Sequence, residues 1–82
     1  MPRFYFDVLD GDSFSCDDEG LQLVSLHAAE DEAIRTVAQL GRDSLPKRLS
    51  PELCVRVRNK HGEAVLTVAV SMTVRRTDLA HA

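Results

Sequence analysis

Hydrophobic and polar residues alternate with a period of two in several stretches of the chain. From residue 2 to 8, apolar side chains fall on one face of an extended chain and polar ones on the other, and residues 53–58 and 64–70 repeat this pattern. A period of two is typical of half-buried strands. A brief alternation over residues 21–23 indicates a further short strand, and the polar residues 10–20 before it predict an acidic loop.

Between these strands, apolar residues recur at helical spacing from residue 26 to 40. Ser25 precedes the first of them and is a favourable N-cap. The pattern is compatible with two C-terminal ends. Gly41 can be the residue that terminates the helix, or the helix continues to about Ser44 and stops before Pro46.

The segment Asn59-Lys60-His61-Gly62 separates the last two strands and predicts a three-residue hairpin loop with a bulge, in which Gly62 is left-handed. Residues 75–82 follow no pattern and predict a frayed tail. We therefore expect an α+β fold: a single domain over residues 1–74, with one helix packed on a small antiparallel sheet of three strands and a short fourth, in the order β-(β)-α-β-β. The expected core comprises Phe4, Phe6, Val8, Leu26, Ala33, Val37, Leu40, Val55, Val57, Leu66 and Val68.

Composition bounds the class of protein. A chain of 82 residues with 44% hydrophobic and 28% charged residues has room for one ordinary globular core. The longest apolar run is too short to cross a membrane and no signal peptide is recognisable, so we expect a cytoplasmic protein that does not bind membranes. In the reducing cytosol, Cys16 and Cys54 are expected to be free thiols.

The net charge of −3 is unevenly distributed. Residues 1–32 hold nine acids and one base, whereas residues 33–82 hold nine bases and four acids. The favoured interpretation is attraction within one folded domain, including an i,i+4 pair between Asp31 and Arg35. The alternative is an anionic partner for the basic part.

The sequence offers little for catalysis or for a cofactor. Asp10, Asp12, Asp17, Asp18 and Glu19 supply oxygens of the kind that calcium prefers, but the EF-hand positions are filled by Phe14 and Leu21. Histidines and cysteines lack metal-site spacing, and the glycines form no phosphate loop. We therefore expect no enzyme activity, no metal site and no cofactor.

The outward face of the expected sheet is the strongest candidate for function. Its residues are Arg3, Tyr5, Cys54, Arg56, Arg58 and Thr67. An open sheet face with an unpaired edge favours association, and we expect a homo-oligomer or a protein partner. The alternative is a weak anion or nucleic-acid binder that uses Arg56 and Arg58.

The opening Met-Pro-Arg-Phe-Tyr-Phe, the loop Asp17-Asp18-Glu19-Gly20 and the hairpin from Val55 to Val68 resemble a family of short bacterial proteins of unknown function, whose members begin M-P-R-[YF]-[YF]-F. The resemblance covers nearly the whole chain, but residues 45–51 are richer in proline and the tail is longer. It implies a bacterial cytoplasmic origin and the strand–helix–hairpin order. It implies no activity and no catalytic residues.

Overall fold

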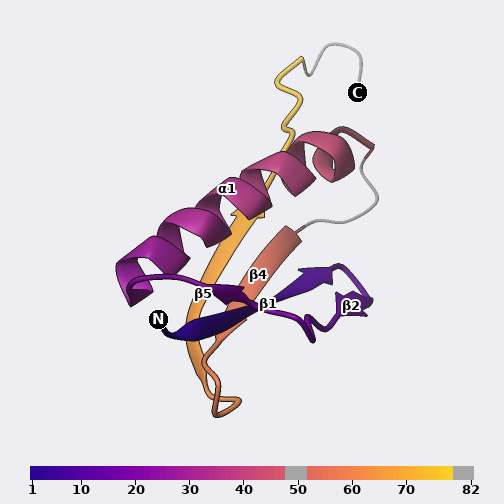
Figure 1. The fold of residues 1–82 in the computed structure, drawn as a ribbon. Coiled ribbons are helices and arrows are strands. Elements are labelled where there is room, and N and C mark those ends of the chain that lie inside the picture. The colour runs from indigo at the N-terminus through magenta and orange to yellow at the C-terminus, as the bar shows by residue number, and fades with distance from the viewer. Residues whose placement is uncertain (48–51, 79–82) are drawn as a thin grey trace.

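In the computed structural model, one helix lies diagonally across one face of an antiparallel sheet (Figure 1). The structure describes residues 1–47 and 52–78. Its elements, in chain order, are β1 (Arg3–Asp10), β2 (Ser13–Ser15), β3 (Leu21–Gln22), α1 (Leu26–Ser44), a short 3-10 turn (Leu45–Lys47), β4 (Glu52–Arg58) and β5 (Ala64–Ser71). The expected α+β class, with one helix on a small antiparallel sheet, is thereby confirmed.

The sheet order is β2-β1-β4-β5, and β3 pairs with β1 as well. On its outer edge β1 therefore has two short partners: β3 at its start, where Phe4 faces Leu21, and β2 at its end, where Leu9 faces Phe14. The described sheet has five strands, one more than expected. The additional strand is β2, which lies in the segment expected to be a loop. Gly11, with φ of 61°, makes the tight turn that folds the chain back onto β1.

The core lies between α1 and the inner face of the sheet. Its buried residues are Phe4, Ala29, Ala33, Val37, Leu53, Val55 and Val57, and Phe6, Val8, Leu23, Leu40, Leu66, Val68 and Val70 pack against them. The prediction that Leu26 belongs to the core is wrong, because its side chain is 49% exposed. It is the first residue of α1. The buried helical stripe begins one turn later, at Ala29.

The two ends of α1 are fixed by different means. Ser25 caps the start as expected, since its Oγ accepts a hydrogen bond from the Ala28 N–H at 3.1 Å. The helix continues to Ser44, so the longer of the two expected ends is correct. Gly41 is thus a buried helical residue, and a Cβ there would lie 3.4 Å from Val70 Cγ1. A small residue at this position lets α1 approach β5 closely.

The charges on α1 pair differently from the expected i,i+4 pair. Arg35 Nη2 lies 2.7 Å from Glu32 Oε2, three residues earlier, and Asp31 lies 3.8 Å from His27 Nε2. The expectation of an Asp31–Arg35 pair is therefore wrong. Glu32 is less exposed than Asp31 and holds the guanidinium by a shorter contact. Exposed pairs of this kind contribute little to stability.

The β4–β5 hairpin closes as the sequence predicts. Gly62 has φ of 81°, and the Gly62 N–H donates to the Asn59 carbonyl at 3.1 Å. Asn59 Oδ1 also accepts from the His61 and Glu63 N–H groups. Beyond β5, residues 72–78 are exposed and form neither helix nor strand. The remaining part of the expected tail, residues 79–82, and residues 48–51 of the linker lie outside the described residues.

Candidate interaction surface

The outer face of the sheet, opposite α1, contains a buried ion pair. Asp7 points to this face and is only 2% exposed. Arg58 binds its carboxylate with two hydrogen bonds, from Nε to Oδ2 at 2.6 Å and from Nη2 to Oδ1 at 3.1 Å. This bidentate geometry is the strongest that arginine offers a carboxylate. The sequence pattern placed Asp7 on the outward face but gave no sign that it is covered.

The acidic loop covers this pair. The Asp17 N–H donates to Asp7 Oδ1 at 2.9 Å, and Arg58 Nη2 donates to the Asp17 carbonyl at 2.8 Å. The same nitrogen lies 3.6 Å from Cys16 Sγ. The hydrogen bonds from Arg58 lower the pKa of Asp7 and outweigh burial, which would raise it. The pair therefore stays ionised and ties the loop to β1 and β4 at once.

The Asp17 side chain completes the outer edge of β1. Its Oδ2 accepts from the Phe6 N–H at 3.0 Å, and its Oδ1 accepts from the Glu19 and Gly20 N–H groups at 3.1 Å. Burial raises the pKa of Asp17, but the three backbone donors together outweigh burial, and the pKa is lowered. The carboxylate thus serves a backbone donor of β1 that lies between the residues paired with β3 and those paired with β2.

Arg3 and Tyr5 hold the far end of the same loop. Arg3 Nη1 donates to the Glu19 carbonyl at 2.7 Å. The Arg58 guanidinium lies over the Tyr5 ring, 5.1 Å from its centroid. Gly20 has φ of 73°, and a Cβ there would stand 2.9 Å from both the Phe4 carbonyl oxygen and Tyr5 Cε2. Only glycine fits this left-handed, crowded position without strain.

The six residues expected to form an interaction face thus fall into two groups. Arg3, Tyr5 and Arg58 hold the acidic loop. The other three lie on the uncovered part of the outer face: Arg56 faces Thr67 across the β4–β5 ladder, and Cys54 faces Ala69 in the same ladder.

Phe14 from β2 also lies on this uncovered part. It is 55% exposed, and its ring centroid is 6.0 Å from Arg56 Cζ. The expected anion-binding role stays a prediction. Of its two arginines, Arg58 is paired with Asp7, so the role would depend on Arg56.

The outer edge of β5 is a further feature of this side of the molecule. Among the described strands, β5 pairs only with β4. Its eight residues, AVLTVAVS, include no charged residue and no proline. Such an edge presents unpaired N–H and C=O groups that can accept another strand. The sequence does contain a signal for it, because residues 64–74 form an uncharged run, but strand order could not be derived from the pattern.

Other candidate chemistry is limited. In residues 1–47 and 52–78, no three His, Cys, Asp or Glu side chains are grouped so as to hold a metal ion. Cys16 is exposed, Cys54 is half-buried, and both are free thiols. No helix within the described ranges is long and apolar enough to span a membrane.

The fold and this surface define a small α+β domain whose sheet, over its described strands, has one covered edge and one bare edge. Residues 3–71 match DUF6894, a domain of unknown function, and the chain belongs to this family. The match extends from β1 through β5 and so includes every described strand and the helix. The expected membership of a family of unknown function is confirmed. Neither the curated proteins nor the solved structures yielded a match.

Proposed function

We propose that this protein is a non-catalytic association module that takes up an additional β-strand along the outer edge of β5. The observation that carries the proposal is the composition of this edge: eight residues without charge or proline, exposed at every second position from Val65 onward. Soluble proteins commonly protect an edge strand with lysine, proline, a bulge or a covering segment. The ladder of β5 with β4 shifts register at Val65, near the hairpin, but from Leu66 to Ser71 it is regular and holds neither charge nor proline. A stretch of this kind is suited to main-chain pairing with another chain.

The surroundings of β5 support the same proposal. Val65, in β5, is 38% exposed, and Met72 and Val74, which follow the strand, are 41% and 59% exposed. Three exposed apolar side chains thus lie along one strand and its continuation. An added strand would cover both the backbone groups and these side chains, and each contributes to affinity.

The experiment uses a fluorescent peptide with the sequence of residues 64–76 as the strand probe. Its binding to the full chain is measured by anisotropy at low and high salt. The test variant carries Thr67→Lys and Ala69→Lys, because lysines on an edge strand oppose further pairing. The matched control carries Ala38→Lys and Gln39→Lys, which add the same charge at exposed positions of α1.

The proposal expects the natural chain and the helix control to bind the probe alike, and the edge variant to lose binding. Apolar and main-chain pairing should persist at high salt, whereas contacts to an anion would weaken. The edge variant should unfold at nearly the same temperature as the natural chain, because Thr67 and Ala69 are exposed. Absence of probe binding to the natural chain, or equal binding to the edge variant, would overturn the proposal.

A further inference from the structure

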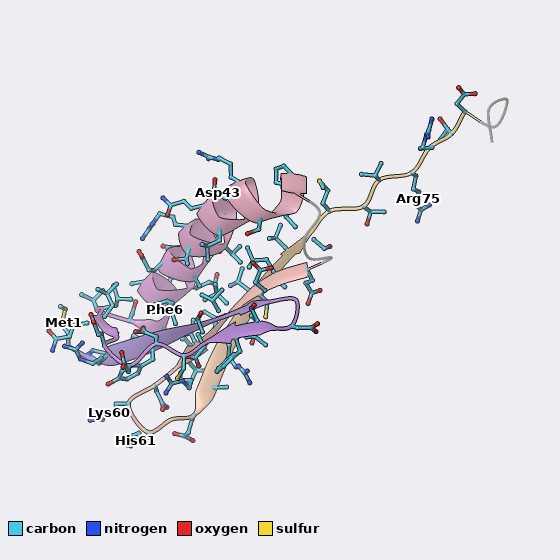
Figure 2. The ribbon with its side chains drawn as sticks, turned by 90° about the vertical axis from the view of Figure 1, so that its right-hand side faces the viewer. Met1, Phe6, Asp43, Lys60, His61 and Arg75 are labelled. Carbon is cyan, nitrogen blue, oxygen red and sulfur yellow. The ribbon has the colours of Figure 1, made fainter. Side chains whose placement is uncertain are left out.

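Beyond β5, the apolar residues continue at the spacing of the strand, but the chain no longer pairs with β4. Leu66, Val68 and Val70 pack against the core below α1. At the same spacing of two, Met72 and Val74 follow, but they lie past the end of the ladder with β4, where Ser71 faces Glu52. Figure 2 shows that this segment, residues 72–78, runs away from the body of the molecule past Arg75. We call it the arm.

We infer that the strand accepted by β5 is β5 of a second copy of this chain, paired antiparallel about a two-fold axis at Ala69. This inference rests on the proposed function and specifies its partner. In such an isologous contact, each residue of the strand faces another residue of the same strand. Because residues 64–74 carry no charge, no register within this run places like charges opposite one another.

The shape of the molecule suits this symmetry. The tip of the β4–β5 hairpin, at Lys60 and His61, and the arm, at Arg75, lie at opposite ends of the molecule (Figure 2). An antiparallel pair therefore places the arm of each copy alongside the hairpin end of the other. The exposed Met72 and Val74 then gain a neighbouring strand that one copy alone does not provide.

The register follows from matching side chains on the two strands. With Ala69 opposite itself, Met72 faces Leu66 and Val70 faces Val68. The two arginines of the arm, Arg75 and Arg76, then reach the hairpin end of the second copy, where Glu63 lies. Ala69 itself is small and exposed, so two such residues can face each other without a clash.

Neighbouring registers fit less well. An axis at Val68 would place Val74 opposite Gly62, and an axis at Val70 would place Arg75 opposite Val65. With the axis at Thr67, Met72 would face Gly62 and pass beyond the end of the partner strand. With the axis at Ser71, Arg76 would face Leu66 and place a charge against an apolar side chain. Cross-strand pairs of matched character favour a register, and a charge against an apolar residue does not.

The test is disulfide trapping in the full chain. The background carries Cys16→Ser and Cys54→Ser, because Cys54 faces Ala69 within the sheet and would capture a cysteine there. Single cysteines are placed by Thr67→Cys, Ala69→Cys and Ser71→Cys, and Ala38→Cys on the exposed side of α1 is the control for random collision. Each variant is oxidised mildly, and covalent dimer is measured by non-reducing electrophoresis.

The inference expects Ala69→Cys to form dimer at least about tenfold faster than the other three variants, because only residues facing each other meet the separation a disulfide needs. A mixture of Thr67→Cys and Ser71→Cys chains should also cross-link, since these positions face each other in this register. Faster trapping at Thr67 or Ser71 alone, or trapping at Ala69 no faster than at Ala38, would overturn it. If the strand probe still binds in that case, association through β5 stands and only the second copy and its register fail.

Discussion

The edge of β1 is filled along most of its length, whereas the edge of β5 is bare in the described part of the sheet. On β1, two short strands and one carboxylate cover the edge together. The strand β3 pairs at the start, β2 pairs at the end, and Asp17 Oδ2 accepts the Phe6 N–H between them. On the other side, the eight uncharged residues of β5 pair with β4 alone among the described strands.

The difference shows where polar interactions in this small domain are concentrated. The Asp7–Arg58 pair, the Asp17 carboxylate and the Arg3 contact all fix the loop that covers the first edge. None of these three interactions involves β5. An exposed edge strand is normally protected, so the regular and uncharged stretch from Leu66 to Ser71, beside a heavily secured edge of β1, favours a binding role for β5.

The largest expected effect comes from breaking the covered edge at its ion pair. Arg58→Ala removes the cation from the Asp7 carboxylate together with the hydrogen bond to the Asp17 carbonyl, and losing one partner of such a pair should lower the free energy of unfolding by about 3 kcal/mol. Chemical denaturation followed by circular dichroism measures the loss. Arg56→Ala, on the same strand, is the matched control and should change the free energy by less than about 1 kcal/mol. Equal effects of the two variants would show that the pair does not secure the loop.

The destabilisation expected for Arg58→Ala also restricts which variant can test the anion-binding alternative. A variant lacking both Arg56 and Arg58 would lose the Asp7–Arg58 pair that secures the loop as well as any ligand site, so its effect on binding would combine two causes. Arg56→Ala alone is the informative variant, since the Arg56 guanidinium lies over Phe14 rather than in the buried pair. Oligonucleotide binding that is unchanged by this substitution would contradict the alternative.

The next largest effect should come from a left-handed glycine. Gly20→Ala places a Cβ 2.9 Å from the Phe4 carbonyl oxygen, in addition to the unfavourable φ, and we expect a loss of about 2–3 kcal/mol. Gly62→Ala at the hairpin tip is the control, because a Cβ there has no neighbour within 4 Å. It should lose only the backbone contribution of about 1 kcal/mol. A Gly20 variant as stable as the Gly62 variant would mean that the loop does not pack closely on β1.

The two edges also differ in how much of their structure could be predicted from the sequence. Alternation identified β1, β4 and β5, helical spacing identified α1, and Ser25 and Gly62 were recognisable as local signals. These features depend on neighbours along the chain. The strand β2 has only three residues, which is too short for a recognisable alternation, so its pairing with β1 could not be predicted from the sequence.

Asp7 illustrates the same limit for the candidate surface. A period of two assigns a residue to a face of the sheet but does not say what covers that face. Burial of Asp7 requires Arg58, which is 51 residues away, and Asp17 from the loop. Likewise, the uncharged run 64–74 is visible in the sequence, but its place at an edge follows only from the strand order.

The ion pair should also make the free energy of unfolding depend on pH in the acidic range. The pKa of Asp7 is lowered by Arg58 from its ordinary value of 3.8, so the folded state favours the ionised form. Its contribution is fully present above pH 3.8 and is lost as the pH falls through the lower pKa of the folded state. Unfolding free energies measured between neutral and strongly acidic pH should therefore decline below this value. In Asp7→Asn the decline should be shallower, and an unchanged slope would contradict an ionised Asp7.

The smallest expected effect is local and compares the two edges directly. Amide exchange followed residue by residue should show the Phe6 N–H protected, although it points out of an edge, because Asp17 Oδ2 accepts it. In the Thr67→Lys, Ala69→Lys chain, every second amide of β5 should exchange rapidly, since these groups face away from β4. Asp17→Ala should accelerate exchange at Phe6 by about tenfold or more while leaving β5 unchanged. If Phe6 exchanges as fast as the bare amides of β5 in both chains, the carboxylate does not substitute for a strand, and the two edges differ less than their contacts indicate.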